Sequence, residues 1–317
     1  MDPQKHMHSN GISIMQNEKT LKTYVVHNPV SGTSDAETVH GKITQALQER
    51  NVPHEIYQTT GQEDLQDVVR DAIERGFQRF VAVGGDGTIQ GVASGLVHTD
   101  LPLVMIPTGT VNALARELEI PFALDDSVRW WMDSGEQRSL DVIEVNGRCY
   151  LLNVSVGAAA NIMKKVKRED IHRFGVLPFI REALRQMNVT TYRFQIEIDG
   201  HKIFTRAAEI FVANSGILLG LQALRLDPET NLDSGKLSVC WARLQTIFDY
   251  VRVAFKIAVQ PNTGKEEFNC MDARREVRIE ANGRIPVQGD GELIGNTPVT
   301  IKLIPHALNV IVPPRPA

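Results

Sequence analysis

Hydrophobic positions in the first third of the chain fall into short runs separated by stretches with helical spacing. Residues 23–27, 53–58, 80–83 and 101–106 have the length of strands, and most of them are continuous apolar runs. Such runs are typical of strands buried on both faces of a parallel sheet. Helical periodicity follows at about 39–50, 65–73, 89–96 and 113–118. Strands and helices that alternate in this way predict right-handed crossovers and helices on both faces of the sheet.

The pattern changes near residue 140, where apolar positions begin to alternate with polar ones. Three dipeptides separate such period-two runs, namely Asn146-Gly147, Asp199-Gly200 and Asn282-Gly283. Because Asn-Gly and Asp-Gly favour the tight turns of β-hairpins, each of the three predicts a hairpin in an antiparallel domain. The last apolar run, residues 308–312, could close either domain.

Composition narrows the class of protein. The chain has 317 residues, 42% of them hydrophobic and 23% charged, with a formal net charge of −4. This length predicts two domains, and the charge gives no general attraction to nucleic acid. The cysteines, Cys149, Cys240 and Cys270, are few and lack metal-ligand spacing, so we expect a reducing compartment and no disulfide framework. No apolar run approaches the ~20 residues of a membrane span.

Three polar, glycine-containing loops follow predicted strands, at residues 28–33, 84–88 and 107–112. The carboxyl ends of parallel strands meet at one edge of the sheet, where such folds bind ligands. The loop Gly84-Gly85-Asp86-Gly87-Thr88 also leads into a helix, whose free N–H groups favour phosphate. Asp86 suits a magnesium or ribose partner there. An ordinary glycine-rich turn remains the alternative for this loop by itself.

Four motifs in order, HNPVSG (27–32), GGDGT (84–88), PTGTVNALAREL (107–118) and QGDGE (288–292), resemble the diacylglycerol kinase catalytic family. That family includes bacterial lipid kinases, ceramide kinases and sphingosine kinases. The resemblance extends over about residues 22–313, because the segment 288–313 also looks like the family's usual ending.

The resemblance implies an α/β fold class: an N-terminal Rossmann-like parallel-sheet nucleotide-binding domain and a C-terminal antiparallel β-sandwich domain. The expected limits are a disordered tail at 1–20, the first domain at 21–140 with 307–317 returning to it, and the lipid-binding sandwich at 141–306. An ATP site in the cleft between the domains is implied as well.

Carried over motif by motif, the resemblance assigns the cofactor-binding residues for ATP. They are Asn28, Pro29, Val30, Ser31, Gly32, Thr59, Gly84, Gly85, Asp86, Gly87, Thr88, Ile89, Gln90, Gly91, Thr110 and Asn112. Asp290 matches the family's proposed general base, with Glu292 beside it. A carboxylate that accepts the proton of a lipid hydroxyl is the simplest way to activate this weak nucleophile. A plain turn aspartate is the competing interpretation of Asp290.

A magnesium site is also implied by the resemblance. Similar proteins hold a Mg²⁺ on a turn that ends in Asp-Asp-Gly, and here Ser234 stands where the second aspartate would be. The candidate ligands are Asn231, Asp233, Ser234 and Lys236, with the backbone carbonyls of Asn231 and Lys236 as the donors for a hard cation.

The resulting functional hypothesis is an ATP-dependent lipid kinase that phosphorylates a diacylglycerol-like or sphingoid hydroxyl, with ATP and Mg²⁺ as cofactors. Two alternatives stay open: a nucleotide kinase similar to NAD kinase, which shares GGDGT, and a catalytically silent lipid- or nucleotide-binding regulator. Thr33, Gln90 and Ala113 depart from the common bacterial pattern, and the segment from Asn112 onward looks closer to the ceramide and sphingosine kinase branch.

The expected partner is a lipid substrate at a membrane surface, bound peripherally and reversibly by a cytoplasmic protein of phospholipid metabolism. Residues 164–185 contain seven Lys or Arg and three acidic residues beside several apolar ones, which suits an anionic membrane, although a solvated helix fits the pattern better. We expect no nucleic-acid partner, and homodimer formation is left open.

Overall fold

The computed structural model describes residues 21–32, 35–158, 160–161, 190–215, 229–242, 249, 252, 255 and 268–314. The chain divides into two compact units, Met1–Ser139 with Leu308–Ala317 and Leu140–Ala307. The limits expected from the sequence, 140 and 307 for the first domain, lie within a residue of this division. The expected tail, 1–20, and the basic segment, 164–185, both fall outside the described residues.

The first unit contains a parallel sheet. Its strands β1 (Thr23–His27), β2 (His54–Gln58), β3 (Arg79–Gly84) and β4 (Leu103–Pro107) lie in the order β2-β1-β3-β4. The end of the last strand, β16 (Val299–Val312), adds a fifth parallel neighbour, since Val310 pairs with Leu103 of β4. The apolar run that could have closed either domain therefore joins the first.

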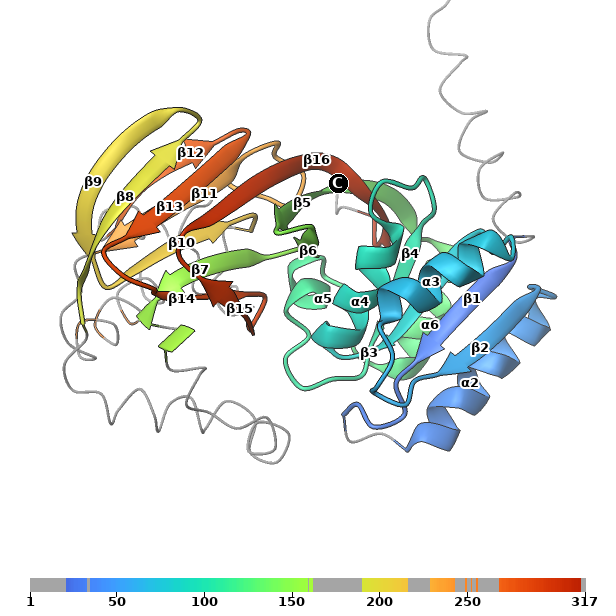
Figure 1. Ribbon diagram of the computed structural model, residues 1–317. Helices are drawn as coiled ribbons and strands as arrows, with labels where there is room; N and C mark the ends of the chain where they lie inside the picture. Colours follow the sequence, from blue (N-terminus) through green and yellow to red (C-terminus); the bar gives the residue numbers. More distant parts are fainter. Residues whose placement is uncertain are drawn as a thin grey trace, which may run out of the picture. The chain divides into compact units, whose positions relative to one another are not determined.

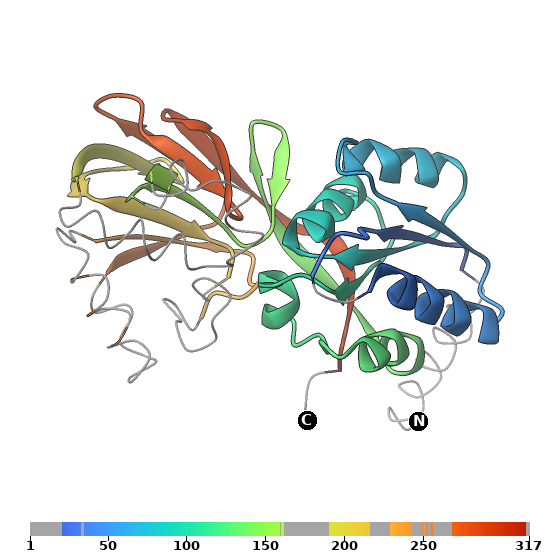
Figure 2. The same ribbon diagram turned by 90° about the horizontal axis from the view of Figure 1, so that it is seen from below.

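Helices cover both faces of this sheet. They are α2 (Ala36–Glu49), α3 (Leu65–Glu74), α4 (Asp86–Leu96), α5 (Ala113–Glu117) and α6 (Leu124–Asp133). Figure 2 shows α3 and α4 on one side of the strands and α2 and α6 on the other. Val39, Ile43 and Leu47 of α2 pack with Val128 and Trp131 of α6 against the valines of the strands. Helix α6 is not among the predicted elements, because its buried apolar residues, Val128 and Trp131, form only a short apolar stripe.

The second unit is built from antiparallel strands (Figure 1). One sheet contains part of β16 with β13 (Glu276–Ala281), β8 (Tyr192–Ile198) and β9 (His201–Ala207), and β5 (Glu136–Val145) with β6 (Arg148–Tyr150) also belongs to it. The other has the order β12 (Asn269–Ala273), β11 (Leu237–Ala242), β10 (Glu209–Ala213), β7 (Asn153–Gly157), β14 (Pro286–Gly289) and β15 (Glu292–Asn296).

A single apolar core joins the two sheets of the second unit. It includes Ile196 and Ile279 from one sheet and Val156, Val212 and Val239 from the other, all fully buried. Side chains from two facing sheets that share a core define a β-sandwich. The predicted fold class, a Rossmann-like α/β domain followed by an antiparallel β-sandwich, is confirmed.

Two of the three predicted hairpins are confirmed. Asn146 and Gly147 have φ of 53° and 76°, and Asp199 and Gly200 have φ of 49° and 92°, as the favoured two-residue hairpin turn requires. The prediction at Asn282-Gly283 is wrong. Strand β13 pairs with β8 and β16, whereas β14 pairs with β7 and β15, so this segment crosses from one sheet to the other.

The expectation of no disulfide is also wrong. Cys240 on β11 lies opposite Cys270 on β12, and their sulfur atoms are 2.06 Å apart, while Cys149 is free. The two residues are separated by 30 positions and belong to no cysteine motif. Only the register of the two strands brings them together, and this register could not be read from the sequence.

None of the helices that the structure describes combines the length and the apolar character that a membrane crossing needs.

Candidate functional site

The three polar loops of the first unit contact one another where β1, β3 and β4 end. The Asn28 side-chain amide donates to the Thr88 hydroxyl at 3.2 Å, which ties the first loop to the second. The hydroxyls of Ser31 and Thr108 are 2.5 Å apart and tie the first loop to the third. Backbone bonds support the same arrangement, because the N–H groups of Asn28 and Thr108 donate to carbonyls at the end of β3.

Glycine allows the loops to approach this closely. A Cβ atom at Gly109 would lie 2.5 Å from the Cα of Gly85, and a Cβ at Gly32 would overlap the carbonyl oxygen of Thr108. Gly32 also has a φ of 74°, which disfavours other residues. These glycines therefore serve loop packing, and side chains at their positions would separate the loops.

Helix α4 presents its N-terminus at the centre of the three loops. Its N-cap is Gly85, which supplies no side-chain hydrogen bond to the first turn. Gly87 in that turn is exposed, and a Cβ atom there would meet no protein atom within 4 Å. A helix start with open space beside its backbone and no capping side chain can receive a phosphate group through N–H donors and the helix dipole.

Asp86 lies in the same turn but is engaged elsewhere. Its carboxylate accepts the N–H of Ala113 at 2.6 Å and thereby holds the start of α5. Burial raises the pKa of Asp86, and bonds from the N–H groups of Ala113, Leu114 and Asn112 oppose that rise. In this structure the carboxylate thus organises the third loop, a role that its motif did not suggest.

Several other predicted nucleotide residues shape the site from within. Asn112 is buried with a φ of 49°, and its amide donates to the carbonyl of Gly109 at 2.6 Å. Gly91 faces α3, where a Cβ would lie 2.9 Å from that of Leu65, and Ile89 is 1% exposed. Four of the predicted residues are exposed to solvent on the loops, namely Val30, Gly32, Gly87 and Thr110. Of the others, Pro29 and Gln90 are half-buried, and Gly84 and Thr88 are buried.

Thr59 lies at the end of β2, beside the end of β1. Its N–H donates to the carbonyl of His27 at 2.9 Å. The next residue, Thr60, is fixed by Glu63, whose carboxylate accepts the Thr60 N–H at 2.7 Å and its hydroxyl at 2.5 Å. The hydroxyl bond is the main reason that the pKa of Glu63 falls to about 2. The turn is thereby held at the loop edge of the sheet.

Asp290 belongs to the second unit and lies in the turn between β14 and β15. It has a φ of 45° and the following Gly291 has a φ of 89°. Its carboxylate accepts three successive backbone N–H groups, from Leu151 at 2.6 Å, Leu152 at 3.0 Å and Asn153 at 2.9 Å. Three such bonds fix the orientation of the carboxylate.

Gln288 supports this turn and was quoted in the motif without a role. Its side chain is buried, its amide nitrogen donates to Asn153 Oδ1 at 3.1 Å and Ser155 Oγ at 2.8 Å, and its oxygen accepts the N–H of Gly291 at 2.9 Å. A glutamine two residues before a glycine-flanked aspartate was the available sequence signal. Glu292 is exposed at the start of β15.

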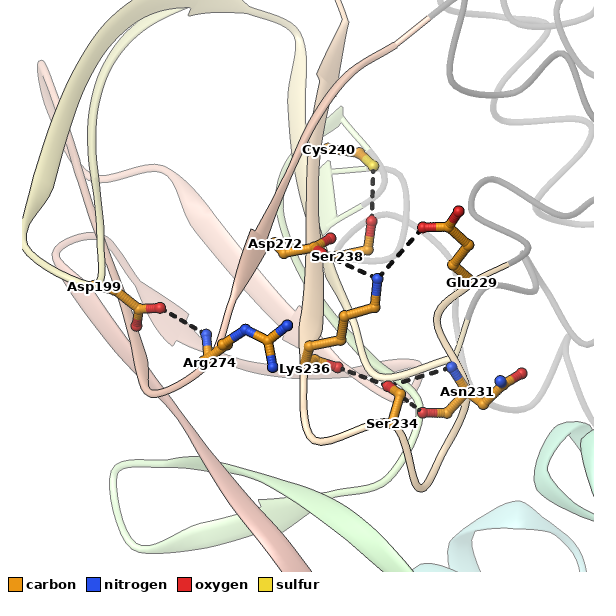
Figure 3. A network of polar contacts seen from close by, with 9 residues as sticks. All are labelled: Asp199, Glu229, Asn231, Ser234, Lys236, Ser238, Cys240, Asp272 and Arg274. Carbon is orange, nitrogen blue, oxygen red and sulfur yellow. Dashed lines mark hydrogen bonds and ion pairs between the residues drawn. The ribbon is translucent and has the colours of Figure 1, made fainter.

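The predicted magnesium turn is closed by its own hydrogen bonds. The Asn231 carbonyl accepts the N–H of Ser234 at 3.0 Å and its hydroxyl at 2.8 Å. Within the described residues, no cluster of three or more His, Cys, Asp or Glu side chains could hold a metal ion. Hydrogen bonds join three of the expected ligands, Asn231, Ser234 and Lys236 (Figure 3). The fourth, Asp233, is half-buried in the same turn.

Comparisons with known proteins identify the family of both units. Residues 22–145 match the family model of the diacylglycerol kinase catalytic domain, and residues 152–312 match that of the YegS C-terminal NAD kinase beta sandwich-like domain. A diacylglycerol kinase of Bacillus subtilis (strain 168) is 23% identical over 297 residues, which cover 92% of this chain and 97% of that protein.

Two further similarities extend over nearly all of the chain. An uncharacterized protein of Synechocystis sp. is 27% identical over 310 residues, 93% of this chain and 71% of that protein. A crystal structure of a diacylglycerol kinase from Bacillus anthracis str. Sterne superposes with a TM-score of 0.71 at 21% identity, covering 92% of this chain and 97% of the other. At this identity the superposition shows the fold alone.

Proposed function

The chain belongs to the diacylglycerol kinase catalytic family, a family of lipid kinases, and from this premise we propose that it transfers the γ-phosphoryl group of ATP to a lipid hydroxyl. The observation that carries the nucleotide part is the uncapped start of α4 among three loops whose contacts require glycine. Phosphoryl transfer asks the protein mainly to align the groups and neutralise charge, and backbone N–H groups at a helix start suit that task.

The loops suggest a division of labour in nucleotide binding. Gly85 and Gly87 would leave the α4 backbone open to the phosphates, while Asn28, Ser31 and Thr88 hold the loops in place through their side chains. Mg²⁺ that arrives with ATP would neutralise phosphate charge. Asp86 contributes indirectly through its bond to the start of α5.

Asp290 is the proposed general base for the lipid hydroxyl. Its support is the place of the carboxylate, in a turn between two glycines at the position that the resemblance assigns to the family's base. General-base catalysis requires such a group to be present in its ionised form and within reach of the proton that it accepts. Glu292 follows in the same motif and would tune the charge beside it.

The experiment that tests this function incubates the purified chain with radiolabelled ATP, Mg²⁺ and a panel of acceptors. The panel contains diacylglycerol, sphingoid bases and ceramide in mixed micelles, and NAD in solution. We expect label in a lipid product after thin-layer separation. Label in NADP would favour the nucleotide kinase, and nucleotide binding without any labelled product would favour the silent regulator.

A glycine substitution tests the nucleotide site apart from the chemistry. Gly87→Ala adds a Cβ that meets no protein atom within 4 Å, so the fold should tolerate it, and a helical Ala is favoured over Gly by roughly 1 kcal/mol. The same methyl group would intrude on a bound phosphate. We expect calorimetry to show ATP affinity reduced by about tenfold or more, which corresponds to about 1.4 kcal/mol.

The matched control is Gly41→Ala in α2. Gly41 is also a helical glycine with no atom within 4 Å of a Cβ, but it lies outside the three loops. It should raise stability similarly and leave ATP affinity unchanged. Equal ATP affinity in both variants and in the wild type would remove Gly87 from the site.

Membrane contact and a cytoplasmic location are proposed from the chemistry of the lipid substrate and not from a surface of the described residues. A lipid hydroxyl lies at a membrane surface, so we propose reversible, peripheral membrane contact by a cytoplasmic protein. Sedimentation with anionic vesicles at low and high salt tests this, because electrostatic binding weakens as ionic strength rises. The basic segment 164–185 lies outside the described residues.

A further inference from the structure

The turn before β11 satisfies its own polar groups. The Ser234 hydroxyl can donate its proton to either of the two carbonyls expected to bind magnesium, that of Asn231 at 2.8 Å or that of Lys236 at 3.3 Å, and its oxygen accepts the Asn231 N–H at 3.4 Å. The Ser234 N–H donates to the same Asn231 carbonyl at 3.0 Å. Figure 3 shows the Ser234 side chain pointing between Asn231 and the backbone of Lys236.

The separations of these oxygens, 2.8 and 3.3 Å, are those of a normal and a longer hydrogen bond. Neighbouring ligands of an octahedral Mg²⁺ would lie at similar separations, about 3 Å. Distance therefore does not separate the two arrangements, and the difference lies in charge. Ser234 contributes a neutral hydroxyl where the resemblance implies a second carboxylate beside Asp233, and Mg²⁺ gives up its water reluctantly.

The framework beneath the turn is rigid. Asp141 is 1% exposed, and its carboxylate accepts the N–H of Gly235 at 2.6 Å and that of His306 at 2.9 Å. The Asp141 N–H donates in turn to the carbonyl of Leu232 at 2.6 Å. The turn is thus anchored through both a donor and an acceptor, independently of any ion.

A protein cation already lies beside the turn. The Lys236 side chain is 11% exposed, and its ammonium group lies 3.0 Å from the Asp272 carboxylate and 3.8 Å from that of Glu229. These pairs use the two carboxylates nearest to the ammonium to balance a positive charge that is largely removed from water. A divalent ion bound by the Lys236 carbonyl would add positive charge to the same residue. The carboxylates of Asp272 and Glu229 already pair with the Lys236 ammonium.

We propose that the Ser234 hydroxyl, by hydrogen bonding to the Asn231 and Lys236 carbonyls, takes the place of the divalent cation that the resemblance implies, so that this turn folds without metal. The turn then lacks the second carboxylate of the expected metal site. A single Ser234→Asp substitution should therefore convert it into a Mg²⁺- or Ca²⁺-binding site. The proposal does not depend on the proposed reaction.

The test measures thermal unfolding of the full chain without nucleotide, in 10 mM MgCl₂ or CaCl₂ and in NaCl of equal ionic strength. The wild type should unfold at the same temperature in all three. Ser234→Asp should have a lowered melting temperature in NaCl, because its carboxylate faces two carbonyls, and should regain several degrees with the divalent salts. Ligand that binds only the folded state stabilises it by mass action.

Two control variants separate charge from shape. Ser234→Asn has the size of aspartate without the charge and should show no divalent-dependent shift. Ser234→Ala removes the hydroxyl bond and should melt roughly 2–4 °C lower in every salt. Calorimetric titration of each variant with CaCl₂ alone gives a second readout that does not require reversible unfolding.

Each remaining outcome overturns the proposal. A divalent-dependent shift in the wild type that Ser234→Ala abolishes would show that the serine turn itself binds metal. No binding of either cation to Ser234→Asp, in a variant that melts cooperatively, would show that the turn does not retain the geometry of a cation site. Equal binding by Ser234→Asn and Ser234→Asp would show that charge is not what the turn lacks.

Discussion

Two Asp-Gly turns of the second unit have the same geometry at different places. Asp199, between β8 and β9, has a φ of 49° and is followed by Gly200 at 92°, while Asp290 and Gly291 have 45° and 89°. The Asp199 carboxylate accepts the N–H groups of Arg274, Arg275 and Glu276 at 2.7, 2.9 and 3.0 Å. The same three-donor pattern holds Asp290, and each aspartate N–H donates to the carbonyl of the third donor residue.

Because the same geometry occurs at two places, it stabilises a hairpin turn independently of any catalytic role. Each hairpin fixes the start of the neighbouring strand, β13 for Asp199 and β7 for Asp290, by binding the N–H groups that precede or begin it. A catalytic role for Asp290 therefore cannot rest on its hydrogen bonds. What distinguishes the two is the surroundings, since Asp290 has Glu292 and the Gln288 side chain beside it, whereas Asp199 adjoins Arg275.

The largest expected difference between the turns is in turnover. Asp290→Asn removes the proposed base, and general-base catalysis contributes about 10²–10⁴-fold, so kcat should fall by that factor at saturating ATP and lipid. Asp199→Asn makes the same chemical change in the same backbone geometry and should leave kcat within about threefold of the wild type, far from that range. ATP affinity should be retained in both variants.

This pair of variants decides between the two interpretations of Asp290. A fall in kcat that is equal in both would assign the loss to weakened folding. Wild-type kcat in a folded Asp290→Asn variant would mean that the aspartate is a turn residue only, like Asp199.

The next effect, which the two variants should share, is on stability. In each variant an NH₂ group, which cannot accept a hydrogen bond, replaces one carboxylate oxygen. The negative charge that strengthened the remaining bonds is also lost. We expect the free energy of unfolding to fall by about 1–3 kcal/mol in both variants, measured by urea denaturation. A loss confined to one variant would show that the shared geometry does not carry equal energy.

The smallest effect is the pH dependence of Asp199. Burial acts to raise its pKa, but the N–H groups of Arg274, Glu276 and Arg275 and the charge of Arg275 bring the pKa below the ordinary value of 3.8. The unfolded carboxyl therefore binds a proton at higher pH than the folded one. The stabilisation is present above about pH 4 and is lost as the pH falls through the lowered pKa.

Urea unfolding between about pH 2.5 and 6 tests this. The stability difference between the wild type and Asp199→Asn should be constant at the upper end of the range and shrink at the lower end. A difference that does not change with pH would mean that Asp199 titrates alike in the folded and unfolded chains.

Much of the fold could be predicted because local signals agreed with tertiary packing. The run 23–27 is buried throughout as β1, and Asn146-Gly147 forms the turn that its residue types favour. The meeting of the three polar loops also followed from parallel topology alone, since loops at strand carboxyl ends share an edge. The contact of Ser31 with Thr108 is one result.

What could not be predicted depends on register and on partners far along the chain. Asn282-Gly283 has the composition of a hairpin turn, yet β13 and β14 find their partners in different sheets. Asp86 belongs to a phosphate-loop motif but caps α5, 27 residues away. Cys240 and Cys270 become bonded only through the pairing of β11 with β12. A single sequence carries no signal for these choices.

The position of β16 sets an order of events during synthesis. Its last residues, among them Val310 and Ile311, are buried in the first unit, where Val310 pairs with Leu103 of β4. The two paired segments lie far apart in the chain, so the edge of β4 has no partner strand until residues 308–312 have been synthesised. Open strand edges recruit other chains, and a product cut short before Leu308 would expose this one permanently.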